Sequence, residues 1–412
     1  MSKPKIRFKG YEEDWEQRKL GDQMYIKSRI GWQRLTQDEY QTEGDYYLIT
    51  GTDINEVTHS IDLTRAYYVS KERYEKDSNI QIIEGDIIVT KDGTIGKVAM
   101  VCGLDKPATL NSHLFVLRDL SGKLNNRFLL HVLDSPIFKS FVEKTKTGST
   151  LTGLPQKTMV EFRFKVSSMK EQERISHFLD NLDSLITLHQ RKCEETKKLK
   201  KYMLQKMFPQ NGKRVPEIRF AGFTDDWEQR KLDDVLKRRI EQRQQSEEYP
   251  RLAFASGQGV IPLSERKTNN REQLTKDEYT KKYLVTELND IVYNPANVKY
   301  GAIDRNKCGR GLISPIYVTF TTNEVPGFIE RIVTSHDFQQ RALRFEEGTV
   351  TKRQSVNPED LVTLDILVAP KREEQQKIAT YFDSLDHLIT LHQRKCEELQ
   401  KIKKFMLQNM FV

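Results

Sequence analysis

The amino-acid sequence predicts an α+β fold, in which two globular mixed α/β domains are joined by two long antiparallel coiled-coil helices, with a pseudo-two-fold internal repeat. Three observations support this prediction. The chain has 412 residues, which is too long for one ordinary domain and suits two. A helical segment occurs twice, and a shorter segment opens each half of the chain. The divergent stretches between these repeats hold short β-strand patterns separated by Gly and Asn turns.

The composition is that of a polar globular chain, with 31% charged and 37% hydrophobic residues. No run approaches the length of about 18 apolar residues that a transmembrane helix needs, and no secretion signal is visible. The four cysteines, Cys102, Cys193, Cys308 and Cys396, show no CxxC spacing, which predicts reduced thiols in a cytoplasmic protein. The net charge of +8 is compatible with a nucleic-acid partner. Many basic proteins bind no nucleic acid, however, so the charge alone decides nothing.

The longer repeat aligns EQERISHFLDNLDSLITLHQRKCEETKKLKKYMLQKMF (171–208) without gaps on EQQKIATYFDSLDHLITLHQRKCEELQKIKKFMLQNMF (374–411). Its apolar residues recur with a heptad-like spacing, and a helix of this length spans roughly 57 Å. One such helix cannot bury its apolar stripe alone, whereas two near-identical helices bury each other. We therefore expect the two helices to pack antiparallel through Ile175, Leu182, Ile186, His189, Met203, Ile378, Leu385, Ile389, His392 and Met406.

Each copy of this repeat carries a His and a Cys four residues apart, at His189 and Cys193 and at His392 and Cys396. Antiparallel packing would bring both pairs together, so a metal site of two His and two Cys is one interpretation. The alternative is that His sets the register of the helices and Cys fills a small buried position. We favour this alternative and expect no metal, because no pattern of ligand-orienting residues accompanies the two pairs.

The shorter repeat matches PKIRFKGYEEDWEQRKLGD (4–22) with PEIRFAGFTDDWEQRKLDD (216–234). The repeats divide the chain as follows: a first domain at 1–170, a helix at 171–208, a linker at 209–215, a second domain at 216–373 and a second helix at 374–412. Only patches align between the two domains. One patch aligns Asp86 with Asp290, another aligns NSHLFVLR (111–118) with ISPIYVTF (313–320), and a third aligns Gly148 with Gly348.

This organisation resembles the specificity (S) subunit of type I restriction–modification systems, over essentially the whole chain. The resemblance is carried by the paired helices, by the openings at 8–20 and 220–232, and by the stretch GDIIVTKDGTIGK (85–97). It implies that each variable domain is a target recognition domain for one half of a bipartite DNA sequence. It also implies that the helix pair sets the gap between the two half-sites.

The partners implied by the resemblance are double-stranded DNA, two methyltransferase (M) subunits and restriction (R) subunits. Those subunits would use S-adenosylmethionine, ATP and Mg²⁺ for adenine methylation and for DNA cleavage. The resemblance implies no catalytic activity and no cofactor for this chain. Two unlike domains on one frame also fit this role, because identical domains would read only a palindrome.

Sequence-specific binding to DNA requires side chains that reach base edges, surrounded by cationic or amide groups on phosphates. Polar basic stretches at matching places in the two domains meet this requirement: residues 91–97 and 144–150 in the first, and 297–300 and 351–355 in the second. An ordinary hairpin turn with exposed lysines is the alternative for 91–97. The candidate DNA-binding residues are Lys91, Thr94, Lys97, Lys144, Lys146, Ser149, Thr150, Asn297, Lys299, Tyr300, Lys352, Arg353, Gln354 and Ser355.

Two further polar stretches are assigned to other roles. Arg29, Gln33 and Arg34 form a stretch that we interpret as a solvated loop. The repeated Asp-Trp-Glu at 14–16 and 226–228 is expected to pack against the helices or to contact the methyltransferase partner.

No complete catalytic motif occurs in the chain. Lys97 follows Gly96, but the P-loop spacing fails, and GxSxG and HExxH are absent. The stretch Asn294-Pro295-Ala296-Asn297 lacks the second proline and the aromatic residue of the amino-methyltransferase motif. We therefore expect no catalysis by the chain alone. Two non-catalytic alternatives remain: a coiled-coil scaffold with two protein-binding modules, and a nucleic-acid binder without an enzyme partner.

Overall fold

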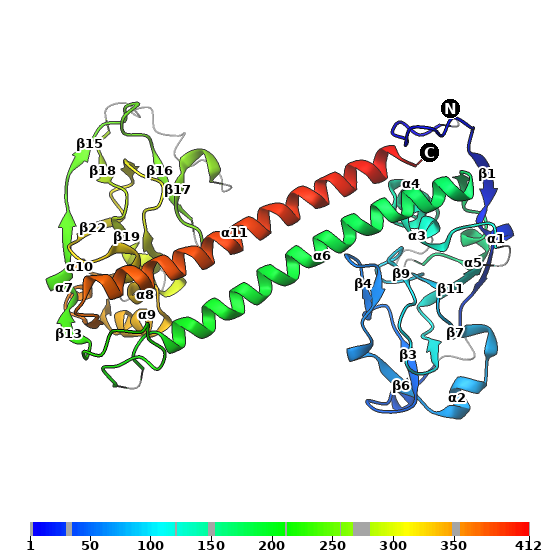
Figure 1. Cartoon of the computed structure of the whole chain (residues 1–412), viewed down its shortest axis with the longest axis horizontal. Coiled ribbons are helices and arrows are strands. Elements are labelled where there is room, and N and C mark those ends of the chain that lie inside the picture. Colours follow the sequence, from blue (N-terminus) through cyan, green and yellow to red (C-terminus); the bar gives the residue numbers. More distant parts are fainter. Residues whose placement is uncertain are drawn as a thin grey trace. The chain divides into compact units, whose positions relative to one another are not determined.

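The computed structural model describes residues 3–29, 35–119, 122–146, 153–210, 212–255, 257–266, 281–347 and 355–411. The chain forms two compact units, one of residues 1–193 with 391–412 and one of residues 194–390. Two long helices, α6 (Met169–Lys206) and α11 (Arg372–Asn409), each contribute residues to both units (Figure 1). The α+β fold with its internal repeat is confirmed. Among the described residues, no helix has both the length and the apolar character needed to cross a membrane.

The first unit is built on a four-stranded antiparallel sheet. Its order is β2 (Met24–Lys27), β11 (Leu114–Asp119), β8 (Ile87–Thr90) and β9 (Val98–Met100). Every residue of β8 and β9 is buried, which is why these strands are continuous runs of apolar and small residues. A second sheet has the order β6 (Tyr67–Val69), β3 (Tyr46–Ile49), β10 (Ala108–Leu110) and β7 (Gln81–Ile82). Helices α3 (Asn126–Asp134) and α4 (Pro136–Thr145) complete the core.

The second unit repeats the first sheet with the same strand order. Here the order is β14 (Leu236–Arg239), β22 (Val318–Thr322), β19 (Ile291–Tyr293) and β20 (Ile303–Arg305). Two further sheets differ from the first unit: one of β15 (Gln242–Arg243), β18 (Tyr283–Thr286) and β21 (Gly311–Ile313), and the hairpin of β16 (Leu252–Ala255) and β17 (Gly259–Pro262). Helices α8 (Pro326–Val333) and α9 (His336–Ala342) take the places of α3 and α4.

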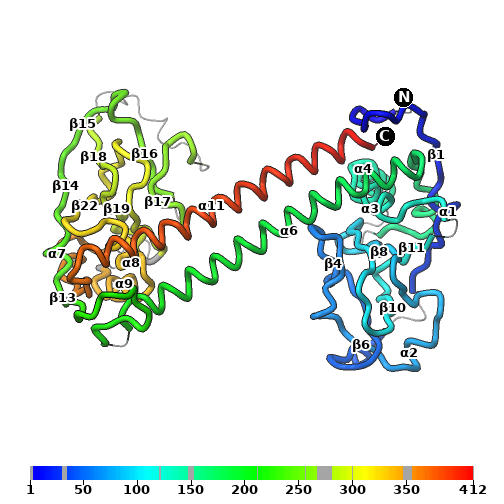
Figure 2. The backbone as a smooth tube through the Cα atoms, viewed as in Figure 1, coloured from blue at the N-terminus to red at the C-terminus, as the bar shows by residue number. Residues whose placement is uncertain are grey.

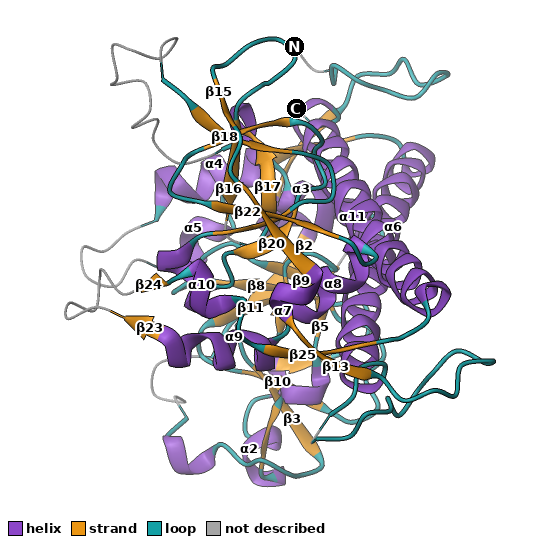
Figure 3. Ribbon diagram, turned by 90° about the vertical axis from the view of Figure 1, so that its left-hand side faces the viewer, coloured by secondary structure: helices purple, strands orange, loops and turns teal. Residues whose placement is uncertain are grey.

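Short elements complete both units (Figure 3). They are α1 (Leu20–Gln23), β4 (Ile54–Asn55), β5 (Ser60–Ile61), α2 (Lys71–Glu75), α5 (Gln156–Met159), α7 (Leu232–Val235), β23 (Glu346–Glu347), β24 (Ser355–Val356) and α10 (Pro358–Leu361), with the 3-10 helices η2 (Gln37–Glu39), η3 (Leu63–Arg65), η4 (Ser78–Ile80), η5 (Leu263–Glu265), η7 (Pro295–Tyr300) and η8 (Leu343–Phe345).

Strand pairing corrects one sequence alignment between the two domains. Leu117 pairs with Ile87, and Phe320 pairs with Ile291, so Leu117 and Phe320 occupy equivalent places. The sequence alignment had matched Leu117 with Thr319, which is wrong by one residue. Because side chains alternate along a strand, this shift exchanges the two faces of the strand. Counted outward from this register, His113, next to β11, corresponds to Ile316, two residues before β22.

The repeated frame closes each unit in the same way. Strand β1 (Glu16–Lys19) pairs with β12 (Arg163–Val166), and β13 (Glu228–Lys231) pairs with β25 (Asp365–Val368) in the same register. The backbone N–H of Ile6 donates to Asn409 O at 3.0 Å, and that of Ile218 donates to Lys206 O at 2.9 Å. The first of these bonds brings the two ends of the chain together in the first unit (Figure 2).

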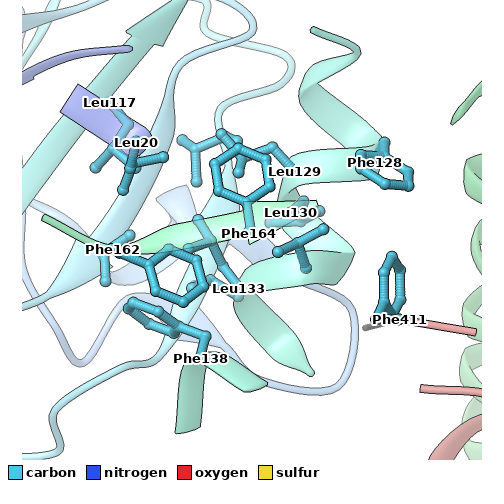
Figure 4. Close-up of a cluster of buried hydrophobic side chains, with 14 of the residues drawn as sticks. Leu20, Leu117, Phe128, Leu129, Leu130, Leu133, Phe138, Phe162, Phe164 and Phe411 are labelled. Carbon is cyan, nitrogen blue, oxygen red and sulfur yellow. The ribbon is translucent and has the colours of Figure 1, made fainter. Parts of the chain in front are cut away.

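The end of each long helix is buried beside the repeated tryptophan. In the first unit Phe411 packs against Phe128, with ring centroids 5.5 Å apart (Figure 4). Phe411 also packs against Trp15, at 6.4 Å. In the second unit Phe208 packs against Trp227 at 5.6 Å. Both tryptophans are buried, at 4% and 1% exposure. The two tryptophans therefore have the packing role that we expected for the Asp-Trp-Glu repeat.

Within each unit the two helix segments run antiparallel. In the first unit the Lys403 ammonium lies 2.7 Å from Asp183, and His189 lies against His392, so numbering rises on one helix as it falls on the other. In the second unit Lys200 pairs with Asp386, and the Phe208 ring packs at a tilt against Phe382. The Lys200–Asp386 pair is the repeat counterpart of the Lys403–Asp183 pair in the first unit.

Candidate nucleic-acid interface

The Gly-rich turn 91–97 connects β8 to β9. The backbone N–H of Thr90 donates to Lys97 O at 3.0 Å, and that of Lys97 donates to the Thr90 hydroxyl at 2.9 Å. Gly93 and Gly96 have φ values of +69° and +88°, which glycine adopts without the steric cost of a Cβ. Thr94 lies exposed between them. The glycines thus permit a tight and internally bonded turn with a side chain at its tip.

The chain segment that follows the second candidate stretch of the first domain contacts this turn. Asp92 forms an isolated β-bridge with Gly153, and the backbone N–H of Leu154 donates to Lys91 O at 2.6 Å. The stretch 144–150 ends shortly before Gly153, and its Ser149 and Thr150 lie outside the described residues. Lys144 and Lys146 are exposed at the end of α4, where Lys146 pairs with Glu143 at 2.9 Å. The structure therefore places one candidate stretch beside the chain segment that follows the other.

Two of the predicted lysines are held more tightly than a solvated phosphate ligand would be. The Lys91 ammonium is 3.3 Å from the Ser28 hydroxyl and 5.7 Å from the centre of the Phe115 ring, and burial lowers its pKa. Lys97 forms an ion pair of 2.6 Å with Glu56. The exposed Lys144 and Lys146 are the stronger candidates for phosphate contact in this domain.

In the second domain a 3-10 helix, η7, replaces the hairpin turn. The Asn294 side chain accepts a hydrogen bond of 3.0 Å from Ala296 N and so begins η7. Asn297 is exposed, and Tyr300 is 67% exposed at the other end. The side chain of Lys299 lies outside the described part of the structure. The equivalent connections thus differ in shape as well as in sequence.

The stretch 351–355 also leads into the region of η7. Lys352, Arg353 and Gln354 lie outside the described residues, and Ser355 is half-buried at the start of β24. The next residue, Val356, accepts a hydrogen bond of 3.2 Å from the hydroxyl of Tyr293, the last residue of β19. In both units, therefore, the residues that follow the second candidate stretch lie against the end of the strand that leads into the first.

A buried aspartate anchors each of these strands at its start. Asp86 accepts two hydrogen bonds from Arg118 at 2.8 and 2.6 Å, and Asp290 accepts two from Arg239 at 2.8 and 3.1 Å. Burial raises the pKa of Asp290, and the Arg239 guanidinium opposes that rise. The two arginines come from different strands, Arg118 from the central β11 and Arg239 from the edge strand β14. The two domains therefore pair the equivalent aspartate with arginines at different positions in the sheet.

The prediction for Arg29 is wrong. Arg29 is 2% exposed, and its guanidinium donates to Leu110 O at 2.9 Å and to the Thr109 hydroxyl at 3.3 Å. Burial lowers its pKa to about 10. Arg29 therefore satisfies backbone and side-chain acceptors inside the domain and is no solvated loop residue. Gln33 and Arg34 lie outside the described residues.

Sequence reasoning missed His113 and Asp92 as candidate functional residues. His113 Nδ1 contacts the Asp92 carboxylate, and His113 O accepts a hydrogen bond of 3.0 Å from Lys91 N. The His113 side chain is 53% exposed. No motif marks such a pair, because the two residues lie 21 positions apart and meet only through strand pairing.

The predicted helix positions are distributed over the two hydrophobic cores. Ile175, Leu182 and Ile186 are buried in the first unit, and Ile378 and Leu385 in the second. Met406 and Met203 are half-buried against these cores, and Ile389 is half-buried. His189 Nδ1 and His392 Nδ1 lie 2.9 Å apart, so one ring donates and the other accepts. The residues that the structure describes contain no group of three or more His, Cys, Asp and Glu able to hold a metal ion.

This histidine pair predicts that the first unit loses stability in acid. Burial and then the charge of His392 lower the pKa of His189, and burial lowers the pKa of the fully buried His131. Because both folded-state pKa values lie below the unfolded value of about 6.5, the unfolded chain binds more protons in this window. The contribution of these histidines to the free energy of unfolding is therefore fully present above about pH 6.5 and decreases as the pH falls further. Calorimetry over a pH series is expected to show a lower unfolding temperature in acid.

A variant with His189→Gln and His392→Gln provides the control, because it keeps a polar pair without titratable rings. It is expected to lose less stability than the wild type on acidification, the remaining loss coming from His131. An unchanged pH profile in this variant would exclude the pair as a source of acid sensitivity.

Comparison with known proteins identifies the class of this duplicated, two-domain chain. A family model for the type I restriction modification DNA specificity domain matches residues 12–198. Two curated specificity subunits from Methanocaldococcus jannaschii are similar over 95% of this chain and 91% of their own length. The provisionally named type I restriction enzyme MjaX specificity subunit is 25% identical over 409 residues, and the type I restriction enzyme MjaVIII specificity subunit is 24% identical over 425.

A solved structure shares the fold. The S subunit of a type I restriction–modification system from M. genitalium covers 100% of this chain and 99% of its own, with a TM-score of 0.66 and 14% identity. The family model and the curated relatives together make this chain similar to the specificity subunits of type I restriction–modification systems.

Proposed function

We propose that each domain of this chain reads one half of a bipartite DNA sequence, that the helix pair sets the gap, and that the chain recruits methyltransferase and restriction subunits to that site. One observation carries the DNA-reading part. In each unit the described residues that follow the second polar stretch, Gly153 and Leu154 or Val356, contact the end of the sheet strand that leads into the first stretch. A protein-binding scaffold gives no reason for basic stretches to recur at equivalent places in both domains.

The contrast between frame and loops supports two different half-sites. The frames share strand register and the arginine–glutamate pairs Arg7–Glu171 and Arg219–Glu374. The connections at the proposed interface differ, a glycine turn in one unit and a 3-10 helix in the other. Unlike loops on like frames suit an asymmetric target, whereas two identical readers would require a palindrome.

A methylation map tests this proposal. The chain is co-expressed with the methyltransferase subunit of its own locus, and modified adenines are mapped along the host genome. The expected result is one bipartite motif with a fixed gap. If the complex assembles and no such motif appears, the chain acts as a scaffold and the proposal fails.

Exposed apolar side chains on the helices support the recruitment of two methyltransferase subunits. In the first unit these are Leu185, Ile402 and Phe405, exposed by 43%, 36% and 53%. Their repeat counterparts in the second unit are Leu388, Leu199 and Tyr202, exposed by 41%, 45% and 49%. Large apolar groups are enriched in protein interfaces and costly to expose. Two equivalent sets suit two copies of the same partner.

The two sets predict a stoichiometry. Replacing Ile402 and Phe405 with Glu places charged side chains in one of the two proposed interfaces. The affinity of one methyltransferase subunit for the chain is therefore expected to fall by at least about 30-fold. Native mass spectrometry should then show one methyltransferase subunit per chain where the wild type holds two. Leu199→Glu with Tyr202→Glu should do the same, and the four substitutions together should leave none. Two bound copies in either pair variant would contradict the assignment.

A further inference from the structure

One exposed position recurs beside the proposed DNA-reading loops of both domains, and it holds unlike residues. In the first unit this is His113, between β10 and β11, with a side chain that is 53% exposed. In the second it is Ile316, between β21 and β22, which is 63% exposed. Counting outward from the register that pairs Leu117 with Ile87 and Phe320 with Ile291 makes the two positions counterparts, with His113 next to β11 and Ile316 two residues before β22.

His113 is held in place from several sides. Its backbone N–H donates to the Asn111 side chain at 3.1 Å, and its carbonyl accepts from Lys91 N at 3.0 Å. Asp92, which contacts His113 Nδ1, is also the residue that bridges to Gly153. The ring is therefore held beside the Gly-rich turn, where Gly153 and Leu154 also contact that turn.

The Asp92 contact also fixes the chemistry that the ring presents. An ionised carboxylate only accepts hydrogen bonds, so the Nδ1 of His113 carries a proton. The other nitrogen, Nε2, then accepts a hydrogen bond when the ring is neutral. Exocyclic amino groups of adenine and cytosine present such donors in the major groove.

Ile316 places a different chemistry at the equivalent point. The register of β19 and β22 ends with Tyr293 opposite Val318, so Ile316 lies two residues before β22, and Pro295, where η7 begins, lies two residues after β19. The backbone N–H of Tyr317 donates to Ser314 O at 3.0 Å and closes the loop that carries Ile316. An apolar side chain at a base edge contacts the 5-methyl group of thymine.

We propose that positions 113 and 316 are specificity-determining in their respective domains: His113, positioned by Asp92, hydrogen-bonds to a base edge of the first half-site, and Ile316 contacts a thymine methyl group in the second. This inference rests on the proposed bipartite reading of DNA. The two residues explain how one frame addresses two different half-sites, because the same position offers a hydrogen-bond acceptor in one domain and a methyl-sized apolar surface in the other.

Methylation maps of single variants test the assignment. His113→Ala is expected to relax one base position in one half-site, with discrimination there falling about 5- to 150-fold. Ile316→Ala is expected to relax one thymine position in the other half-site, and the gap should stay constant in both. His113→Gln replaces the ring by an amide, which should shift the same position towards adenine.

Two further variants separate the specific effect from a general one. Asp92→Asn replaces a carboxylate that only accepts by an amide that also donates, so the His113 tautomer is no longer fixed and the same base position as in His113→Ala should change. Ile240→Ala removes an isoleucine that is 76% exposed on the second unit and should leave both half-sites unchanged. Co-purification with the methyltransferase subunit reports folding, and His113→Gln serves as the test if His113→Ala fails to fold.

The outcomes distinguish this inference from the function beneath it. If the wild type gives a bipartite motif and the His113 and Ile316 variants give the identical motif to the same extent, the inference is overturned while the proposed function stands. If the wild-type complex gives no motif, the proposed function fails and the inference fails with it. Loss of discrimination at one base position, in the half-site expected for each variant, supports both the inference and the proposed function.

Discussion

Replacing Arg7 with alanine is expected to destabilise the first unit by about 3 to 5 kcal/mol, because it leaves a buried carboxylate without its counter-charge. The Arg7 guanidinium forms two hydrogen bonds, of 2.7 and 2.8 Å, with Glu171. The Glu171 side chain is 0% exposed and that of Arg7 is 12% exposed. This pair joins the N-terminal repeat to the start of α6, so its loss should also detach β1 from β12.

The second unit contains the matched experiment. Arg219 pairs with Glu374 in the same geometry, at 2.6 and 2.8 Å, so Arg219→Ala should destabilise the second unit by a similar amount. Hydrogen–deuterium exchange, measured separately on peptides of β1 and β13, should show each variant loosening its own unit. The exposed pair of Arg18 with Glu16 is the control, and Arg18→Ala should cost at most about 1 kcal/mol.

A double substitution sharpens the physical claim. Replacing both partners, with Arg7→Met and Glu171→Leu, removes the unpaired charge together with the pair and should recover most of the lost stability. An Arg7→Ala variant as stable as the control Arg18→Ala would show that water or another cation reaches Glu171 when Arg7 is gone.

The frame was predictable from the sequence because its signals are local or duplicated. The heptad-like spacing marked both long helices, and the repeated opening marked the segments that pair with β12 and β25. Trp15 and Trp227 could be assigned to packing because both were copied together with their surroundings. Because the frame occurs twice in one chain, residues that are identical in both copies indicate which positions the fold requires.

The candidate interface was less predictable because its side chains are placed by partners far away in sequence. Arg29 seemed solvated, yet it bonds to Leu110, 81 positions away. Lys97 pairs with Glu56, and Lys91 is half-buried against Phe115, so two apparent phosphate ligands are partly engaged within the domain. Such partners depend on strand order and register, which composition and local pattern do not determine.

The repeat counterparts Lys403 and Lys200 should differ in their importance, although sequence treats them alike. The Lys403 ammonium lies 2.7 Å from Asp183 and 3.2 Å from Asp134, and its side chain is only 11% exposed. Although burial alone would raise the pKa of Asp134, His59 and then Lys403 hold it below its usual value, so this carboxylate stays ionised. Lys403→Ala is therefore expected to cost about 3 to 5 kcal/mol in the first unit.

Lys200→Ala is expected to cost about 1 kcal/mol or less in the second unit. The Lys200 and Asp386 side chains are 24% and 31% exposed, so water screens the pair. Arg331 also lies 2.9 Å from Asp386 and neutralises it when Lys200 is removed. Thermal unfolding, followed for each unit by hydrogen exchange, should show a large loss for Lys403→Ala and a small one for Lys200→Ala. Equal losses would mean that the common helix repeat, and not the divergent domain packed on it, sets the strength of these contacts.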